Sequence, residues 1–244
     1  MAGPAPVSGL RAVHVVVPAR NEEQLIGRCL DALSDARTAL RAERPTLEVR
    51  VTVVLDGCAD GTAAIVRRAD AVDALHVTEL TPGGARAAGV RRVGDLASDL
   101  DGGQVWVACT DADSVVPVGW LADQVQCAEE GVVCRVGTVH PELGPAERRL
   151  HLGWLARHSH ADGHVHVHGA NLGFTLAAYE QAGGFAPLDC GEDVDLVRRI
   201  RAAGLPVRST GHDPVRTSAR RSSRVRGGFA DYLATLAVDL ARAT

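Results

Sequence analysis

Short runs of apolar residues alternate with helical patterns through the first half of the chain. We expect strands over 13–17, 49–55, 74–80 and 105–110, because each run is apolar and rich in β-branched residues, as buried strands are. Between these runs the apolar positions fall at helical spacing, and Asn21 is placed to cap the first helix. Strands that alternate with helices predict a parallel, doubly wound α/β sheet.

The second half of the chain has a less regular pattern. It predicts one further strand and three further helices, over 132–139 and over 146–157, 194–203 and 229–241. Residues 168–174 resemble a loop that enters a strand, and Gly204 with Pro206 marks the end of a helix. No internal repeat and no long linker interrupts the chain, so we expect a single domain.

Unusual polar or glycine-rich residues follow each of the four predicted strands of the first half. They are 18–22, 56–60, 82–86 and 111–113. Because ligands of doubly wound sheets bind beyond the carboxyl ends of the strands, we expect these segments to share one rim. Asp111 and Asp113 suit a divalent cation with a phosphate-bearing ligand, although aspartates are also common in turns.

The composition restricts the classes of protein. Hydrophobic residues make up 46% and charged residues 23%, which is typical of a globular protein. No apolar run is long enough to span a membrane, no secretion signal is visible, and the 6 cysteines form no CxxC pair. We therefore expect a reduced, cytoplasmic protein.

Basic residues are distributed unevenly. All 26 Lys+Arg residues are arginine, which excludes a Walker-A lysine and a Schiff-base lysine. The net charge of −4 gives no reason to expect a nucleic acid partner. Residues 216–226 contain five arginines and no acid, which favours a local anion site.

Taken in order, the motifs resemble those of family 2 glycosyltransferases with the GT-A fold. The matching segments are VVVPARNEE, VVLDGCADGT, PGGARAAG, DAD, HGANLGF and GGFAPLDCGEDVDLVRRI, which together span roughly residues 13–203. The resemblance implies transfer of a sugar from a nucleotide diphosphate sugar to an acceptor hydroxyl. One departure is Gly57-Cys58-Ala59, where the family often has a second acid or a Ser-Thr pair.

The resemblance also implies roles for particular residues on the donor side. The expected donor-binding residues are Pro18, Arg20, Glu22, Asp56, Arg86, Asp111, Ala112 and Asn171. Among them, Asp56 would meet the base, Arg86 the base or diphosphate, and Asp111 the ribose. Asp113 would bind the Mn2+ or Mg2+ ion that bridges the diphosphate, with His212 as a second candidate metal ligand.

The acidic pair Glu192-Asp193 matches the catalytic motif of the family. Asp193 is our candidate general base for the acceptor hydroxyl, and Glu192 would orient the acceptor or the loop. Capping of the following helix is the alternative role for these acids. We expect inversion of configuration, while a retaining transferase and a catalytically weak nucleotide-sugar-binding protein remain as alternatives.

The resemblance divides the chain into a nucleotide-sugar-binding half over about 10–115 and an acceptor and catalytic half over about 116–215. Residues 216–244 would form a basic lid segment and a closing helix. Five histidines crowd residues 158–168, which favours a mobile acceptor loop, with His168 near the donor sugar and the other four solvated, over a zinc or copper site. The acceptor would be a small molecule or a lipid-linked one reached from the cytoplasm at the membrane surface.

Other enzyme classes fit the motifs less well. A haloacid-dehalogenase-type phosphatase would carry its DxDx[TV] motif after the first strand, whereas here the matching residues 111–115 follow the fourth. A nucleotidyltransferase would have a glycine-rich loop where this chain has PARNEE. A nicotinamide oxidoreductase would need GxGxxG at the same place.

Overall fold

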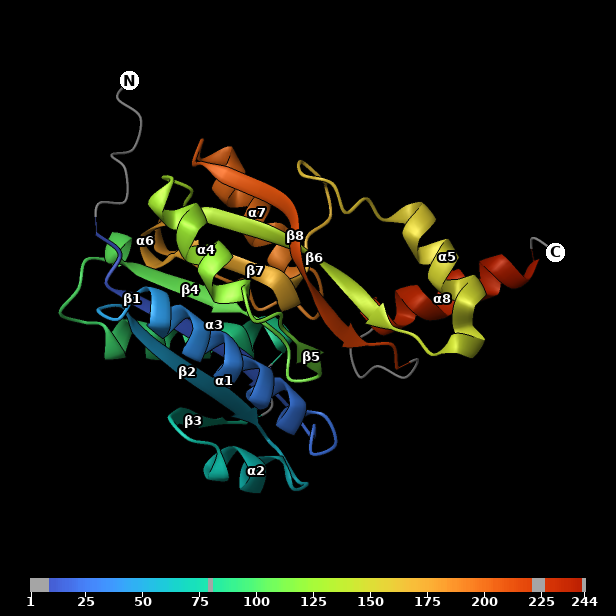
Figure 1. The fold of residues 1–244 in the computed structure, drawn as a ribbon, viewed down its shortest axis with the longest axis horizontal. Coiled ribbons are helices and arrows are strands. Elements are labelled where there is room, and N and C mark those ends of the chain that lie inside the picture. The colour runs from blue at the N-terminus through green and yellow to red at the C-terminus, as the bar shows by residue number, and fades with distance from the viewer. Residues whose placement is uncertain (1–8, 79–80, 221–226, 243–244) are drawn as a thin grey trace.

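One sheet forms the centre of the protein (Figure 1). The structure is a computed structural model and describes residues 9–78, 81–220 and 227–242. Eight strands of this part lie in the order β3-β2-β1-β4-β7-β6-β8-β5. In chain order they are β1 (Ala12–Ala19), β2 (Glu48–Asp56), β3 (Val72–Val77), β4 (Val105–Cys109), β5 (Ser114–Val115), β6 (Cys134–Glu142), β7 (Leu172–Thr175) and β8 (Val207–Ser218).

The strands of the first half are parallel, as the sequence predicts. β1 lies between β2 and β4 and pairs in parallel with both, and β3 extends the same arrangement from β2. Their carboxyl ends therefore reach the same edge of the sheet. The second half is mixed, because β7 runs antiparallel to β4 and β6, while β8 is parallel to β6 and antiparallel to β5. The predicted α/β class is confirmed.

Helices cover both faces of the sheet. They are α1 (Ile26–Glu43), α2 (Thr62–Arg68), α3 (Pro82–Leu96), α4 (Trp120–Glu129), α5 (Arg148–Arg157), α6 (Leu176–Gln181), α7 (Glu192–Ala202) and α8 (Phe229–Arg242). Helices α1, α2 and α4 contribute to one buried apolar cluster, and α3, α6 and α7 to a second cluster on the opposite face. Side chains along β1 alternate between the two clusters, because successive residues of a strand point to opposite faces.

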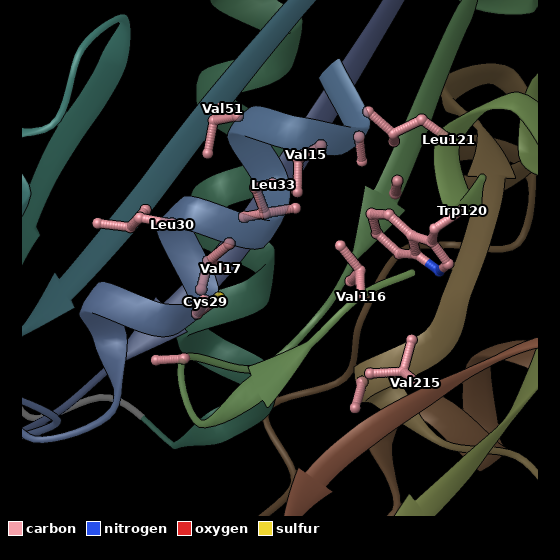
Figure 2. Packing of buried hydrophobic residues seen from close by; sticks show 14 of the residues in the cluster. Val15, Val17, Cys29, Leu30, Leu33, Val51, Val116, Trp120, Leu121 and Val215 are labelled. Carbon is pink, nitrogen blue, oxygen red and sulfur yellow. The ribbon is translucent and has the colours of Figure 1, made fainter. Parts of the chain in front are cut away.

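The first apolar cluster joins the two halves of the chain. Figure 2 shows Leu33 of α1 near Val15 and Val17 of β1, with Trp120 of α4 and Val215 of β8 in the same cluster. Trp120 and Val215 are both 0% exposed. The packing of α1 against α4 and β5, which in turn contact β8, thus holds the rim of the first half beside the end of β8.

Helices α5 and α8 pack against each other at one end of the molecule (Figure 1). The Arg157 guanidinium lies 3.2 Å from the Asp239 carboxylate, and Gly153 of α5 faces the Leu240 side chain. The helices predicted over 146–157 and 229–241 are thus both present. Among the described residues, no helix is both long and apolar enough to cross a membrane. All six cysteines are free thiols.

One local expectation is wrong, and one strand was not predicted. Asn21 does not cap α1, which begins five residues later with Leu25 as its N-cap residue. Asn21 instead takes a φ of 54° and its side-chain oxygen accepts a hydrogen bond from the Ala59 amide at 2.8 Å. The sequence also failed to predict β8, whose letters VRSTGHDPVRTS show little apolar alternation. The predicted strand over 74–80 extends into residues 79–80, which lie outside the described part.

Candidate active site

The loops after β1 and β2 are joined by hydrogen bonds. The Glu22 amide donates to the Thr62 hydroxyl at 2.7 Å, and the Gly61 amide donates to the Glu23 carboxylate at 2.7 Å. Glu22 is 7% exposed, so its carboxylate is held inward at this edge. Arg20 is 3.5 Å from Asp56 at the end of β2. Pro18, which is also predicted to bind the donor, lies within β1 and is paired with Val54 of β2.

The Asp111-Ala112-Asp113 turn follows β4 and leads into β5. Ala112 is 3% exposed and packs in the first apolar cluster, so its side chain anchors the turn. One oxygen of Asp113, Oδ1, lies 3.4 Å from the Thr217 hydroxyl, and the Asp113 carbonyl accepts from the Ser218 amide at 3.2 Å. Burial, followed by the negative charge of Asp111, raises the pKa of Asp113 to about 6.

Arg86 connects the turn after β4 to the acidic pair Glu192-Asp193. Its guanidinium, at the first turns of α3, donates to Asp111 on one side and to Glu192 on the other. The side chain is 8% exposed and lies against Gly169, where a Cβ would come within 2.7 Å of the guanidinium carbon. Burial alone would lower the pKa of Arg86, but Asp111 and Glu192 outweigh it and raise that pKa.

The acidic pair Glu192-Asp193 opens helix α7. Gly191, with a φ of 78°, precedes it in the left-handed region that favours glycine. The Val194 amide donates to Asp193 at 2.8 Å, and the Gly169 amide also donates to this carboxylate. Glu192 is buried and bound to Arg86, whereas Asp193 is partly exposed. Burial raises the pKa of Asp193, and the nearby positive charge of Arg86 offsets part of this.

Arg220 completes this constellation from the far end of the chain. Its guanidinium donates to both oxygens of Glu22, at 2.8 and 2.7 Å, and lies 3.0 Å from Asp113 Oδ2. The sequence indicated only a basic segment over 216–226, and no motif singled out this arginine. The arginines of this segment that follow Arg220 lie outside the described residues. We call Glu22, Arg86, Asp111, Asp113, Glu192 and Arg220 the ionic rim.

Asn171 has a supporting position inside the protein. Its side-chain oxygen accepts from Trp120 Nε1 and from Arg135 Nη1, both at 2.8 Å. Its side-chain nitrogen donates to the carbonyls of Thr138 and Asp213, at 2.8 and 3.2 Å. The amide group is thus fully used within the protein, and the residue is 0% exposed. The predicted donor contact from this side chain is therefore replaced by support of the turn that carries Gly169.

His212 lies away from the ionic rim. It is exposed in β8, five residues before the Thr217 that contacts Asp113, and its carbonyl accepts from Arg135 at 3.0 Å. The carboxylates that interact with it electrostatically include Asp162 and Asp213. The structure does not bring His212 to Asp113, so its predicted role as a metal ligand has no support from this arrangement.

The carboxylates of the rim fit a divalent ion that arrives with a ligand. Asp111 and Asp113 supply the hard oxygen atoms that Mg2+ and Mn2+ prefer. Across the described ranges, no group of three or more His, Cys, Asp and Glu side chains is arranged to hold an ion. Because Mg2+ is commonly bound by one or two carboxylates together with substrate phosphates, the remaining ligands would come from a diphosphate.

A cluster of aromatic rings borders the acidic pair Glu192-Asp193. We call it the histidine cluster, and it consists of Trp154 with His158, His160, His164, His166 and His168. The ring centroids of Trp154 and His158 lie 3.4 Å apart. His158 and His164 are buried, so the expectation that the histidines other than His168 are solvated is wrong. Burial, and then the neighbouring His158 and His166, lower the pKa of His168 to about 3.

Comparison with known proteins identifies the family to which this α/β fold belongs. The family model for glycosyl transferase family 2 matches residues 14–173. The chain therefore belongs to glycosyl transferase family 2, as its motifs predict. No curated protein sequence matches the chain.

Solved structures share the fold. A mannosyltransferase from Pyrobaculum calidifontis, in complex with GDP-Man and Mn2+, aligns with a TM-score of 0.58 and 24% identity over 91% of this chain. The chain spans only 60% of that protein. Glucosyl-3-phosphoglycerate synthase from Mycobacterium tuberculosis, in complex with Mn2+, UDP and glucosyl-3-phosphoglycerate, aligns with a TM-score of 0.55 and 15% identity, over 99% of this chain and 83% of its own. At these identities the likeness establishes the GT-A fold.

Proposed function

We propose that this protein is a metal-dependent glycosyltransferase that moves a sugar from a nucleotide diphosphate sugar to an acceptor hydroxyl, with inversion at the anomeric carbon. The observation that carries this proposal is the convergence of two acidic pairs on one arginine. Arg86 contacts Asp111 of the first pair and Glu192 of the second. The Asp111-Ala112-Asp113 turn, which would bind the cation, and the pair Glu192-Asp193, which would supply the base, thus lie on two sides of one buried guanidinium.

The donor would lie along the carboxyl ends of β1, β2 and β4. In this proposal Asp56 and Arg20 face the base, Pro18 and Glu22 border the nucleotide, and Asp111 accepts from the ribose. Ala112 contributes through its backbone, because its side chain is buried in the core. The order of these residues along the rim follows the order of the parallel strands, which supports a single extended donor site.

Asp193 would take the proton of the acceptor hydroxyl. As the acceptor oxygen attacks the anomeric carbon, the bond from that carbon to the diphosphate oxygen breaks, and the acceptor proton passes to the Asp193 carboxylate. Burial raises the pKa of Asp193, which makes its carboxylate a stronger base. The hydrogen bonds from Val194 and Gly169 hold the carboxylate in one orientation. Glu192, bound to Arg86, would position the pair rather than transfer a proton.

The leaving group is a nucleoside diphosphate, on which negative charge develops. A bound Mn2+ or Mg2+ ion supplies a Lewis acid that stabilises this charge, and Asp113 would hold it together with the diphosphate oxygens. Arg86 is fixed between Asp111 and Glu192 and keeps these carboxylates from repelling the donor. Its two ion pairs would therefore maintain the spacing between the donor and the base.

The acceptor side would comprise residues of about 116–215, including the loop of the histidine cluster. His168 directly precedes Gly169, whose amide binds Asp193, and this placement supports an acceptor near these rings. The acceptor would be a small molecule or a lipid-linked one, and the protein would act in the cytoplasm or at the membrane surface. The chain would comprise the two halves described above, with residues 216–244 closing the donor side.

A thermal-shift panel tests the donor and metal parts of this proposal. We expect one nucleotide sugar to raise the melting temperature in the presence of Mn2+ and to have little effect in its absence. A free sugar and a nucleoside monophosphate serve as controls, because neither carries a diphosphate. Stabilisation by no nucleotide sugar would contradict the proposal. The anomeric configuration of the product, measured by NMR, then separates inversion from retention.

A further inference from the structure

Asp113, the proposed metal-binding carboxylate, has both oxygens engaged within the protein. Oδ1 lies 3.4 Å from the Thr217 hydroxyl and 3.5 Å from the Ser114 hydroxyl. Oδ2 lies 3.0 Å from a guanidinium nitrogen of Arg220. A divalent ion that approaches Asp113 must therefore share Oδ2 with a positively charged group or displace it.

Arg220 is held firmly at this position. Its fork donates to both oxygens of Glu22, and its amide donates to the Ser218 hydroxyl at 3.3 Å. A planar guanidinium suits such two-point contact with a carboxylate better than an ammonium group does. The backbone just before it is fixed by the pairing of β8 with β5, in which Thr217 lies opposite Ser114.

The carboxylates that Arg220 contacts are nearly buried. The side chains of Glu22 and Asp113 are 7% and 11% exposed, whereas that of Arg220 is 40% exposed. Two carboxylates that are so little exposed to solvent need a positive charge between them, because uncompensated buried charge is strongly unfavourable. The guanidinium therefore occupies the place of a cation at the rim, and its side chain is the most exposed of the three.

We propose that Arg220 is the resident cation of the donor site, which releases Asp113 when a divalent ion arrives with a diphosphate. This inference rests on the proposed function, because the diphosphate is that of the proposed donor and the ion is the one proposed to bind with it. While Arg220 holds Asp113, the ion alone binds weakly. The diphosphate supplies further oxygen ligands to the ion and a new anionic partner to Arg220, so the ion and the nucleotide bind together.

Titration of the full chain with Mn2+ alone, followed by the EPR signal of the free ion, tests this competition without any turnover. We expect Arg220→Ala to bind Mn2+ about tenfold more tightly than the wild type, since removal of one charge near a carboxylate is worth at least one such factor. Arg220→Lys should lie between them, because it keeps the charge but loses the fork. This second variant also provides the measurement if the alanine variant fails to fold.

Arg216→Ala is the matched control. Arg216 lies on strand β8, four residues before Arg220, where it lines a separate cleft with His140 and His151. Its loss should leave the Mn2+ affinity of the protein unchanged. In a second arm, UDP and GDP are added. Each nucleotide that binds should increase Mn2+ affinity strongly in the wild type and less in Arg220→Ala, because the variant no longer has the competing cation.

The two arms separate this proposal from the proposed function. Equal or weaker Mn2+ affinity of Arg220→Ala without nucleotide would overturn the role of Arg220, even if nucleotides bind normally with Mn2+. Tighter Mn2+ binding by the variant without any response to UDP or GDP would support the competition at Asp113 and count against these donors. An equal gain in Arg216→Ala would also overturn the proposal, because the effect would then reflect net charge.

Discussion

The ionic rim and the histidine cluster meet at the acidic pair Glu192-Asp193, yet they stabilise buried polar side chains in opposite ways. The rim retains its charges and pairs them, as Arg86 does with Asp111 and Glu192. In the cluster, burial lowers the pKa of His158, His166 and His168, and the His158 ring stacks on Trp154. Removal of one partner thus leaves an uncompensated charge in the rim. In the cluster, an uncompensated charge arises when a histidine is protonated at low pH.

Asp193 lies where the two regions meet, and its loss should have the largest effect on catalysis. We expect Asp193→Asn to lower kcat by about 10²–10⁴-fold, because the amide cannot accept the acceptor proton. Donor affinity in the thermal-shift assay should change little. Asp195→Asn is the control, since Asp195 lies on the same helix and pairs with Arg198 and Arg199 instead. A kcat of Asp193→Asn within tenfold of the wild type would mean that another group acts as the base.

Arg86→Met should have the largest effect on stability. It leaves Asp111 and Glu192 without their shared partner, and removal of one member of a buried pair costs about 3–5 kcal/mol. The melting temperature should fall by on the order of 10 °C. Chemical denaturation measures the free energy of unfolding. A loss below about 1 kcal/mol would show that water already stabilises these carboxylates.

The histidine cluster should make stability depend on pH. Burial lowers the pKa of His168 to about 3 in the folded protein, while the unfolded chain binds the proton near pH 6.5. The unfolded state therefore binds more protons between these values, and stability decreases as pH falls below 6.5, by up to roughly 1.4 kcal/mol per pH unit for this group. His168→Asn should flatten the curve between pH 6.5 and 5. An unchanged slope would show that His168 is protonated in the folded state.

Arg92→Ala should have the smallest effect and provides the comparison for Arg86. Arg92 lies on the same helix, but its pair with Asp73 at 2.9 Å is exposed to solvent. Exposed ion pairs contribute little, so the melting temperature should change by no more than about 2 °C. A fall similar to that of Arg86→Met would show that helix α3, rather than the rim, accounts for the loss.

Local sequence patterns predicted the parts of the fold that depend on burial of a continuous run. β1, β2 and β4 are apolar because helices cover both of their faces, so their letters alone identify them. The loops after these strands could be assigned to one rim because parallel strands fix where their ends lie. The donor half was thus predicted more completely than the rest.

The polar strand β8 could not be predicted in this way. It pairs with β6 and β5, which shields its backbone without requiring apolar letters at every second position. Asn171 was expected at the donor for a similar reason: a motif indicates that a residue matters, but not which partners its side chain meets. In the structure those partners are Trp120, Arg135 and two carbonyls.

The sequence by itself determined the α/β class, the family and the acidic pairs at the ends of strand and helix. Only the tertiary structure placed Arg86 between Asp111 and Glu192, and brought Arg220 to Glu22 across 198 positions of the chain. Periodicity encodes which face of an element is buried, because that choice is made locally. The pairing of distant charges depends on the order of strands in the sheet, and no local pattern contains that order.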